Sequence, residues 1–118
     1  MDEIPEKYRT DLAIIRETAE QINRDITVDD FSVVLTGSEA NAFSEIKDQL
    51  RPFLKKLFKR DKKVFQSMLY RIDISEKHYR KLLRETEIEQ TADELAELII
   101  RGEFQKVLTR RFFSEKDK

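Results

Sequence analysis

The sequence predicts an all-α protein, a small bundle of four or five helices with one long central helix. Only two Gly and two Pro occur among 118 residues, and 40% of the residues are charged, which together are typical of helical proteins. Hydrophobic residues make up 39% of the chain, enough to form one core at this length. We therefore expect residues 1–118 to form a single helical domain, with a frayed tail from about residue 114.

The predicted central helix spans residues 51–72. Placed at about 100° per residue, its apolar side chains share one side and stay in phase across the charged residues 59–63. This continuity predicts one unbroken helix, because a new helix starting at Asp61 would place Lys62 and Lys63 at the positive end of its dipole. The apolar side consists of Phe53, Leu54, Leu57, Phe58, Val64, Phe65, Met68, Leu69 and Ile72.

Asp61 lies near the centre of this apolar side and breaks its pattern. One interpretation is a buried carboxylate with a chosen partner, at a ligand site. The interpretation that we favour is structural, because buried charges are usually paired. In that case Asp61 pairs with an Arg of another helix or lies at the rim of the core.

The first helix is expected from about Ile4 to Asp25, with Pro5 in its first turn. Its apolar residues are spaced by three and four, as in the narrow seam of a coiled coil about three heptads long. The seam can pack in a groove of its own chain, which we favour, or form a homodimer with a second copy. The candidate interaction seam comprises Tyr8, Leu12, Ile15 and Ile22, joined by Leu108 and Phe112 of the last helix.

Residues 27–37 break the helical periodicity but contain several apolar side chains. We expect an ordered connection that plugs the bundle, with a short strand as the less favoured alternative. Gly37 marks a turn. A helix should follow from Ser38 or Glu39, and Pro52 predicts a kink or a brief break near residue 51.

Ser75 is the expected N-cap of a helix over residues 76–84. That helix is expected to bury Tyr79, Leu82 and Leu83. The polar residues of the preceding turn have two interpretations: they cap helix ends, which we favour, or they meet a partner. The residues that a partner would meet are Tyr70, Arg71, Asp73 and Glu76.

The last helix is expected to start at the capping pair Thr91 and Glu94 and to be among the most buried segments. Gly102 either bends this helix or caps it. The inward residues are expected to be Ala92, Leu95, Ala96, Ile99 and Ile100, followed by Phe104, Val107 and Leu108.

Two motifs in the second half of the chain carry a resemblance: LYRIDISE at residues 69–76 and LAELIIR at residues 95–101, the latter followed by QKV. They resemble a group of small helical bacterial proteins with an LYRxDxxE turn and an LAxLIIxR helix. The resemblance covers about the last half of the chain. It implies a compact cytosolic helical domain and no known activity. Gly102 departs from the group, which is expected to have a bulkier, usually charged residue there.

Little in the sequence indicates catalysis. His78 is the single histidine, which excludes a choice of triad partners and a two-His metal site within one chain. Ser75 stands three residues before His78, where a ferritin-type metal motif has Glu. The chain has no Cys for a zinc site, and its two Gly are isolated, unlike those of a phosphate-binding loop. We therefore expect no enzyme activity, no metal and no cofactor.

The start of the chain, residues 1–9, is acidic and lacks the apolar core of a signal peptide. No apolar run approaches the ~18 residues of a membrane span. Together with the absence of Cys, these features favour a cytoplasmic location.

Charge is segregated along the chain, although the formal net charge is only −1. Residues 1–30 carry −5 and residues 85–103 carry −6, whereas residues 51–63 carry +6 and residues 104–118 carry +3. Acidic and basic helices of one small domain are expected to pack beside one another.

The function predicted from these features is protein interaction, most simply self-association into a homodimer through the first or last helix. The alternative is a nucleic-acid-binding accessory protein that uses the basic face of the central helix. An isoelectric point of about 5.9 weighs against this alternative. The candidate nucleic-acid-binding residues are Lys55, Lys56, Lys59, Lys62, Lys63, Arg110 and Arg111.

Overall fold

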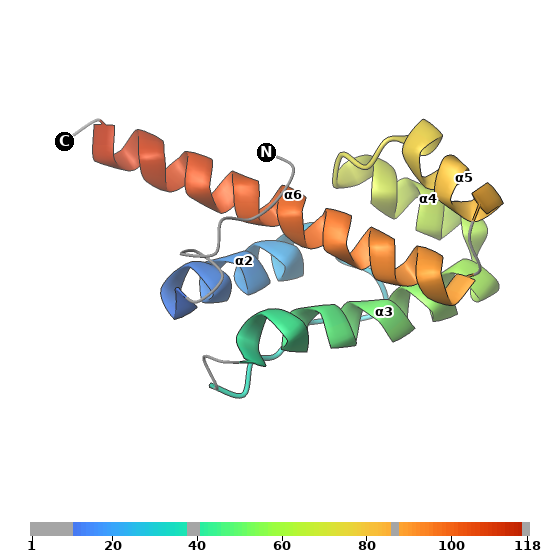
Figure 1. Ribbon diagram of the computed structural model, residues 1–118, viewed down its shortest axis with the longest axis horizontal. Coiled ribbons are helices and arrows are strands. Elements are labelled where there is room, and N and C mark those ends of the chain that lie inside the picture. Colours follow the sequence, from blue (N-terminus) through green and yellow to red (C-terminus); the bar gives the residue numbers. More distant parts are fainter. Residues whose placement is uncertain (1–10, 38–40, 86–87, 117–118) are drawn as a thin grey trace.

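The longest helix, α6 (Ile88–Lys116), runs along the whole molecule and organises the other helices (Figure 1). The computed structural model describes residues 11–37, 41–85 and 88–116. Helices α2 (Leu12–Asp25) and α3 (Ala42–Arg60) pack along α6. Helices α4 (Lys62–Arg71) and α5 (Glu76–Glu85) lie at the end of the molecule where α6 begins. The predicted all-α fold is confirmed, but α6 takes the central place expected of residues 51–72.

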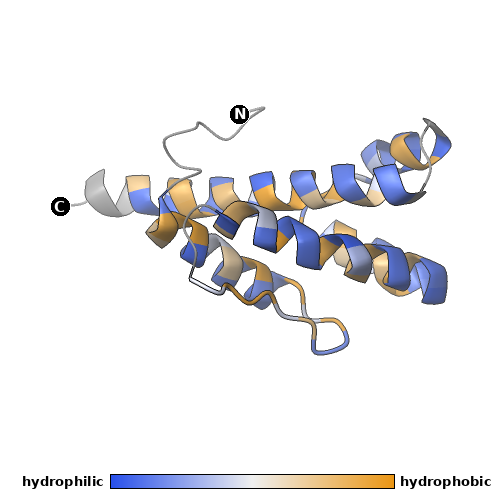
Figure 2. Cartoon of the chain, turned by 60° about the horizontal axis from the view of Figure 1, so that its bottom comes forward, coloured by the Kyte–Doolittle hydropathy of each residue, from blue (hydrophilic) through white to orange (hydrophobic). Residues whose placement is uncertain are grey.

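The core lies between α6 and the two helices that pack along it. Apolar residues form bands on the sides of the helices that face one another (Figure 2). Burial of such bands is the main favourable contribution to folding. The inward residues predicted for the last helix are all at most 1% exposed, which confirms their placement: Ala92, Leu95, Ala96, Ile99 and Ile100.

The predicted unbroken helix over residues 51–72 is wrong, because the chain leaves the helical conformation at Asp61. This residue is extended, with φ −151° and ψ 91°, and ends α3 by donating its N–H to Leu57 O at 2.8 Å. Its carboxylate accepts the N–H of Val64 at 3.2 Å and so caps α4. The Asp61 side chain accepts an N–H of the first turn of α4 that has no acceptor within the helix. Its negative charge also offsets the unfavourable interaction of Lys62 and Lys63 with the positive end of the helix dipole. Asp61 is therefore a half-buried cap, without an Arg partner among the described residues.

Neither Pro52 nor Gly102 ends a helix. Pro52 is an exposed residue inside α3, so the expected break near residue 51 is wrong. Gly102 is exposed inside α6, which excludes the capping alternative. Thr91 is also inside α6 and fully buried, with its hydroxyl donating to Leu82 O at 3.3 Å. The predicted capping pair of Thr91 and Glu94 is therefore wrong: packing against α5 uses the Thr91 side chain instead.

The two ends of the chain differ from the predicted limits. Helix α2 begins at Leu12, because Asp11 is extended and its carboxylate accepts the N–H groups of Ala13 and Ile14. A single helix from Ile4 to Asp25 is therefore wrong, although its end at Asp25 is confirmed; residues 4–10 lie outside the described residues. At the other end, α6 continues to Lys116, past the expected start of a frayed tail.

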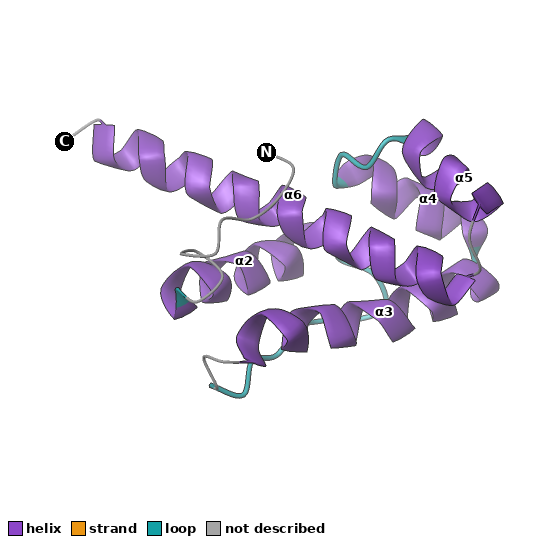
Figure 3. Ribbon diagram, in the orientation of Figure 1, coloured by secondary structure: helices purple, strands orange, loops and turns teal. Residues whose placement is uncertain are grey.

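The connection from α2 to α3 is ordered and non-helical, and contains no strand within its described residues 26–37 (Figure 3). Its buried Val28 and Val33 confirm the predicted plug. The side-chain amide of Asn23 bonds both backbone groups of Val33, at 2.7 and 3.1 Å. Gln49 does the same for Val34, at 2.9 and 2.8 Å. Two side-chain amides thus satisfy the backbone groups that a neighbouring strand would otherwise pair.

The turn predicted at Gly37 is confirmed by its φ of 101°, a conformation that favours glycine. The expected helix start at Ser38 or Glu39 lies outside the described residues. Helix α3 is described from Ala42.

The capping role of Asp61 can be tested by substitution. We expect Asp61→Ala to lower the free energy of unfolding by about 1 kcal/mol, because the amide of Val64 loses its acceptor. Asp61→Asn keeps an acceptor and should retain most of the stability. Urea denaturation of the three proteins measures the difference. An increase in stability with Asp61→Ala would contradict the capping role and favour a continuous helix.

Candidate functional site

Three helices contribute basic side chains to one end of the molecule. The second half of α3, all of α4 and all of α5 lie at the same end of the long axis (Figure 1). Residues 51–85 contain twelve Lys and Arg against four Asp and Glu. We name the exposed cations of this region the basic end: Lys56, Lys59, Arg60, Lys62, Lys63, Arg71, Lys77, Arg80, Lys81 and Arg84.

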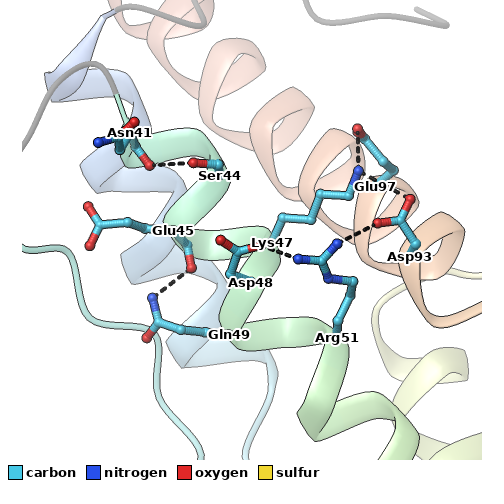
Figure 4. A network of polar contacts seen from close by, with 9 residues as sticks. All are labelled: Asn41, Ser44, Glu45, Lys47, Asp48, Gln49, Arg51, Asp93 and Glu97. Carbon is cyan, nitrogen blue, oxygen red and sulfur yellow. Dashed lines mark hydrogen bonds and ion pairs between the residues drawn. The ribbon is translucent and has the colours of Figure 1, made fainter. Parts of the chain in front are cut away.

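Basic residues on the opposite side of α3 are paired with acidic residues of α6 (Figure 4). Lys47 Nζ lies 3.3 Å from Asp93 and 3.1 Å from Glu97, and Arg51 lies 3.0 Å from Asp93. The expected packing of acidic and basic helices beside one another is confirmed.

Lys55, a member of the predicted nucleic-acid-binding set, is also paired with an acidic residue of α6. Lys55 Nζ lies 3.8 Å from the carboxylate of Glu89 on α6. Its charge is therefore directed toward the body of the molecule.

Some cations of the basic end also have partners. Arg60 pairs with Asp29, and Arg71 donates to Thr27 Oγ1 at 3.2 Å. Lys62 lies over the ring of Phe58, 5.1 Å from its centroid. Arg80 pairs with Glu76 within α5. Six of the exposed cations have no acidic, aromatic or hydrogen-bonded partner within the described part of the chain: Lys56, Lys59, Lys63, Lys77, Lys81 and Arg84.

The structure divides the predicted nucleic-acid-binding set between two ends. Arg110 and Arg111 belong to the far end of α6, away from α4 and α5 (Figure 1). Arg111 holds Glu17 of α2 in a two-pronged pair at 2.8 and 3.1 Å, and Arg110 donates to Gln21. These two Arg hold α2 against α6.

The sequence-based prediction omitted the four cations of α5 from the nucleic-acid-binding set: Lys77, Arg80, Lys81 and Arg84. A signal for them was present, because Lys77, Lys81 and Arg84 recur at helical spacing opposite Tyr79 and Leu82.

The predicted interaction seam is partly used inside the chain. Ile15 and Ile22 are fully buried, as expected of a bundle helix packed in its own chain. Leu12 and Leu108 are half-buried, and Phe112 is 60% exposed. Tyr8 lies outside the described residues.

The corner between α4 and α5 contains a cleft of about 470 Å³. Its rim includes Tyr70, which is 83% exposed, and its wall includes the buried Tyr79, whose hydroxyl has no hydrogen-bond partner within the described residues.

Ser75 Oγ accepts the N–H of His78 at 3.2 Å, which confirms the predicted cap. The half-buried Leu82 and Leu83 and the buried Tyr79 confirm the inward side of this helix.

A buried carboxyl group on α6 escaped the sequence-based prediction. Glu103 is 1% exposed and lies on the apolar side of the helix, because it follows Ile99 and Ile100 by one turn. Glu103 Oε1 accepts from Lys106 Nζ at 3.4 Å, and Lys106 also bonds Asp25 of α2 at 2.9 Å. Glu103 Oε2 accepts no hydrogen bond from the described residues.

The three charged groups shift one another's pKa values. Burial, followed by the hydrogen bond with Asp25, raises the pKa of Glu103 to about 8, so its neutral form can donate to Asp25. Burial acts to raise the pKa of Asp25 also, but its bonds with Glu103, Lys106 and Gln21 outweigh this and lower it. Burial acts to lower the pKa of Lys106, but the two carboxyl groups outweigh it and raise that pKa.

Searches against family models, curated proteins and solved structures return no match for this chain. The site is therefore interpreted from its own geometry. Within the described residues, no three His, Asp or Glu side chains gather as a metal site requires, and no helix is long and apolar enough to cross a membrane.

The buried Glu103 predicts a pH-dependent stability. Between about pH 4.5 and pH 8 the carboxyl group ionises in the unfolded chain but stays neutral in the folded one, so stability falls as pH rises through this window. We expect Glu103→Gln, which stays neutral, to match the wild type near pH 5 and to exceed it by a few kcal/mol at pH 9.

Urea denaturation across this pH range measures the effect. Glu20→Gln is the matched control, since Glu20 is exposed on α2. A constant difference between Glu103→Gln and the wild type at every pH would contradict the prediction.

Proposed function

We propose that this protein binds nucleic acid through the basic end formed by α3, α4 and α5. The observation that supports the proposal is the set of six exposed cations without an acidic, aromatic or hydrogen-bonded partner in the described part of the chain: Lys56, Lys59, Lys63, Lys77, Lys81 and Arg84. Nucleic acids carry a dense row of phosphates, and cations that neutralise them release condensed counterions. The proposal is a binding function and involves no catalytic step.

The low net charge of the whole chain does not oppose this proposal. Several acidic residues are already paired within the molecule, among them Asp93 and Glu97 with Lys47, and Glu17 with Arg111. The potential at a surface depends on the charges that face it, and nearby charges contribute most because salt screens beyond about 10 Å. The basic end can therefore attract phosphates although the formal net charge is −1.

Self-association through the end of α6 is a second candidate. It is favoured by Phe112, which is 60% exposed and lies one turn beyond the half-buried Leu108. A large exposed apolar side chain next to a partly covered one is a common feature of protein interfaces. Ile15 is fully buried, so substituting it would test folding and not association.

Salt-dependent titration tests the nucleic-acid proposal. We expect the full chain to bind random-sequence DNA or RNA with a dissociation constant that rises steeply with salt concentration. Lys56→Glu/Lys59→Glu should weaken binding and lower the slope of log affinity against log salt by about two, because two phosphate contacts are lost. Fluorescence anisotropy with labelled oligonucleotides measures both quantities.

The matched control is Arg16→Glu/Arg24→Glu, which removes two exposed cations from α2. Equal weakening by the two double variants would show a non-specific charge effect. Absence of binding at low salt would refute the proposal.

Light scattering at low and high salt tests self-association. If the end of α6 forms an apolar interface, the wild type should be a dimer that survives high salt, and Phe112→Asp should make it a monomer. Val34→Asp is the control, since Val34 is similarly exposed, at 63%, in the connection before α3. A monomer at every protein concentration would eliminate this second candidate.

A further inference from the structure

The turn between α4 and α5 is held by a complete set of hydrogen bonds. Asp73 has a φ of 66°, and its N–H donates to Tyr70 O at 3.1 Å. The N–H of Ile74 donates to Leu69 O at 2.8 Å, which completes the pattern that ends a helix with one left-handed residue. Ser75 then caps α5. Four residues, 72–75, thus join α4 to α5 in one defined conformation.

Helix α5 is fixed to the two helices before it by a series of aromatic contacts. The ring of Tyr79 meets Phe65 of α4 edge to face, with centroids 6.1 Å apart. Phe65 meets Phe58 of α3 in the same manner at 5.4 Å. Helix α5 also accepts a hydrogen bond from Thr91 of α6 at Leu82 O. Because α5 is attached to both α4 and α6, its outer side is presented in a fixed orientation.

The outer side of α5 is almost entirely basic. Lys77, Lys81 and Arg84 follow one another at spacings of four and three, so they share one side of the helix. His78, in the first turn, is also exposed. Among the described side chains of α5, Glu76 is the one acidic group, and it is paired with Arg80.

We infer that α4, the turn at residues 72–75 and α5 form a helix-turn-helix unit that seats α5 in the major groove of duplex DNA. The inference rests on the proposed function and adds the kind of nucleic acid and the reading helix. A helix-turn-helix unit is two helices joined by a turn of three or four residues, whose second helix enters the major groove with its first residues at the base edges. Lys77 and His78 occupy that place in α5.

The dimensions and the surrounding charges fit this arrangement. An α-helix with its side chains is ~10–12 Å across, which matches the ~12 Å width of the major groove, and the 10 residues of α5 extend ~15 Å along its axis. Lys donates to the O6 and N7 atoms of guanine, which lie in that groove. The second half of α3, which carries the exposed Lys56 and Lys59, and α4, which carries the exposed Lys63, lie at the same end of the molecule as α5 (Figure 1). In the inferred complex these cations neutralise phosphates beside the groove.

Duplex DNA is favoured over the other nucleic acids for two reasons. The major groove of an RNA duplex is too deep and narrow for protein side chains to read, and so cannot receive α5. Single strands are bound by rows of exposed aromatic rings on which bases stack. Between residues 51 and 85 the exposed rings are those of Tyr70 and His78, which are too few for such a row, because Phe65 and Tyr79 are buried.

Anisotropy titrations of the full chain with three labelled probes of one random sequence test the inference: a DNA duplex, its single strand and the RNA duplex. We expect the DNA duplex to bind most tightly. Lys77→Ala/Lys81→Ala should weaken its binding about tenfold or more. Lys56→Ala/Lys59→Ala should weaken all probes and lower the salt dependence. Arg16→Ala/Arg24→Ala serves as the control on α2.

Methylation of guanine N7 in the DNA duplex provides a measurement on the wild-type protein, so the test does not depend on the folding of any variant. This modification blocks the major-groove edge and should weaken binding by about tenfold or more if α5 lies there. The inference is overturned if methylation has no effect, or if the single strand or the RNA duplex binds as tightly as the DNA duplex.

The inference and the proposed function fail in different ways. If Lys77→Ala/Lys81→Ala binds like the control while Lys56→Ala/Lys59→Ala binds more weakly, the proposed function holds and the helix-turn-helix inference fails. Absence of binding to all three probes overturns both.

Discussion

The burial of one side of α6 against α2 and α3 is the constraint on which the rest of the structure depends. Ile99, Ile100 and Phe104 are at most 1% exposed, and each side chain of this size contributes about 1.5–3 kcal/mol when fully buried. Ion pairs such as Lys47 with Glu97 line the margin of that contact. Exposed pairs of this kind contribute little stability individually, but opposite charges that meet in only one arrangement favour that orientation of the helices.

This arrangement also explains the distribution of charge over the surface. Three acidic residues of α6, Glu89, Asp93 and Glu97, pair with cations of α3. The cations farther along α3 and those of α4 and α5 have fewer acids within reach. A chain with almost no net charge thereby acquires one strongly basic end, and the functional proposals follow from this asymmetry.

The packing of α6 also buries the carboxyl group of Glu103, which costs free energy of solvation. Glu103 lies on the side of α6 that is buried, so its carboxyl group is removed from solvent. Burial raises its pKa to about 8, and the group is mostly neutral below that pH. Lys106 compensates part of this loss by donating to Glu103 Oε1, and it also binds Asp25 across the α2–α6 contact. Buried polar groups of this kind can restrict two helices to one register, since a shifted register would leave them unpaired.

Local features of the sequence determined much of the fold and a part of the candidate site. Helical spacing identified the buried side of α6, Ser75 was recognised as a cap, and Lys56, Lys59 and Lys63 were placed on an exposed basic face, because each depends on residues within a few turns. The pairing of Glu103 and Lys106 with Asp25, the separation of Arg110 and Arg111 from the other cations and the place of α5 beside α4 were decided by the tertiary structure. They depend on which distant helices meet, and neither periodicity nor spacing specifies those contacts.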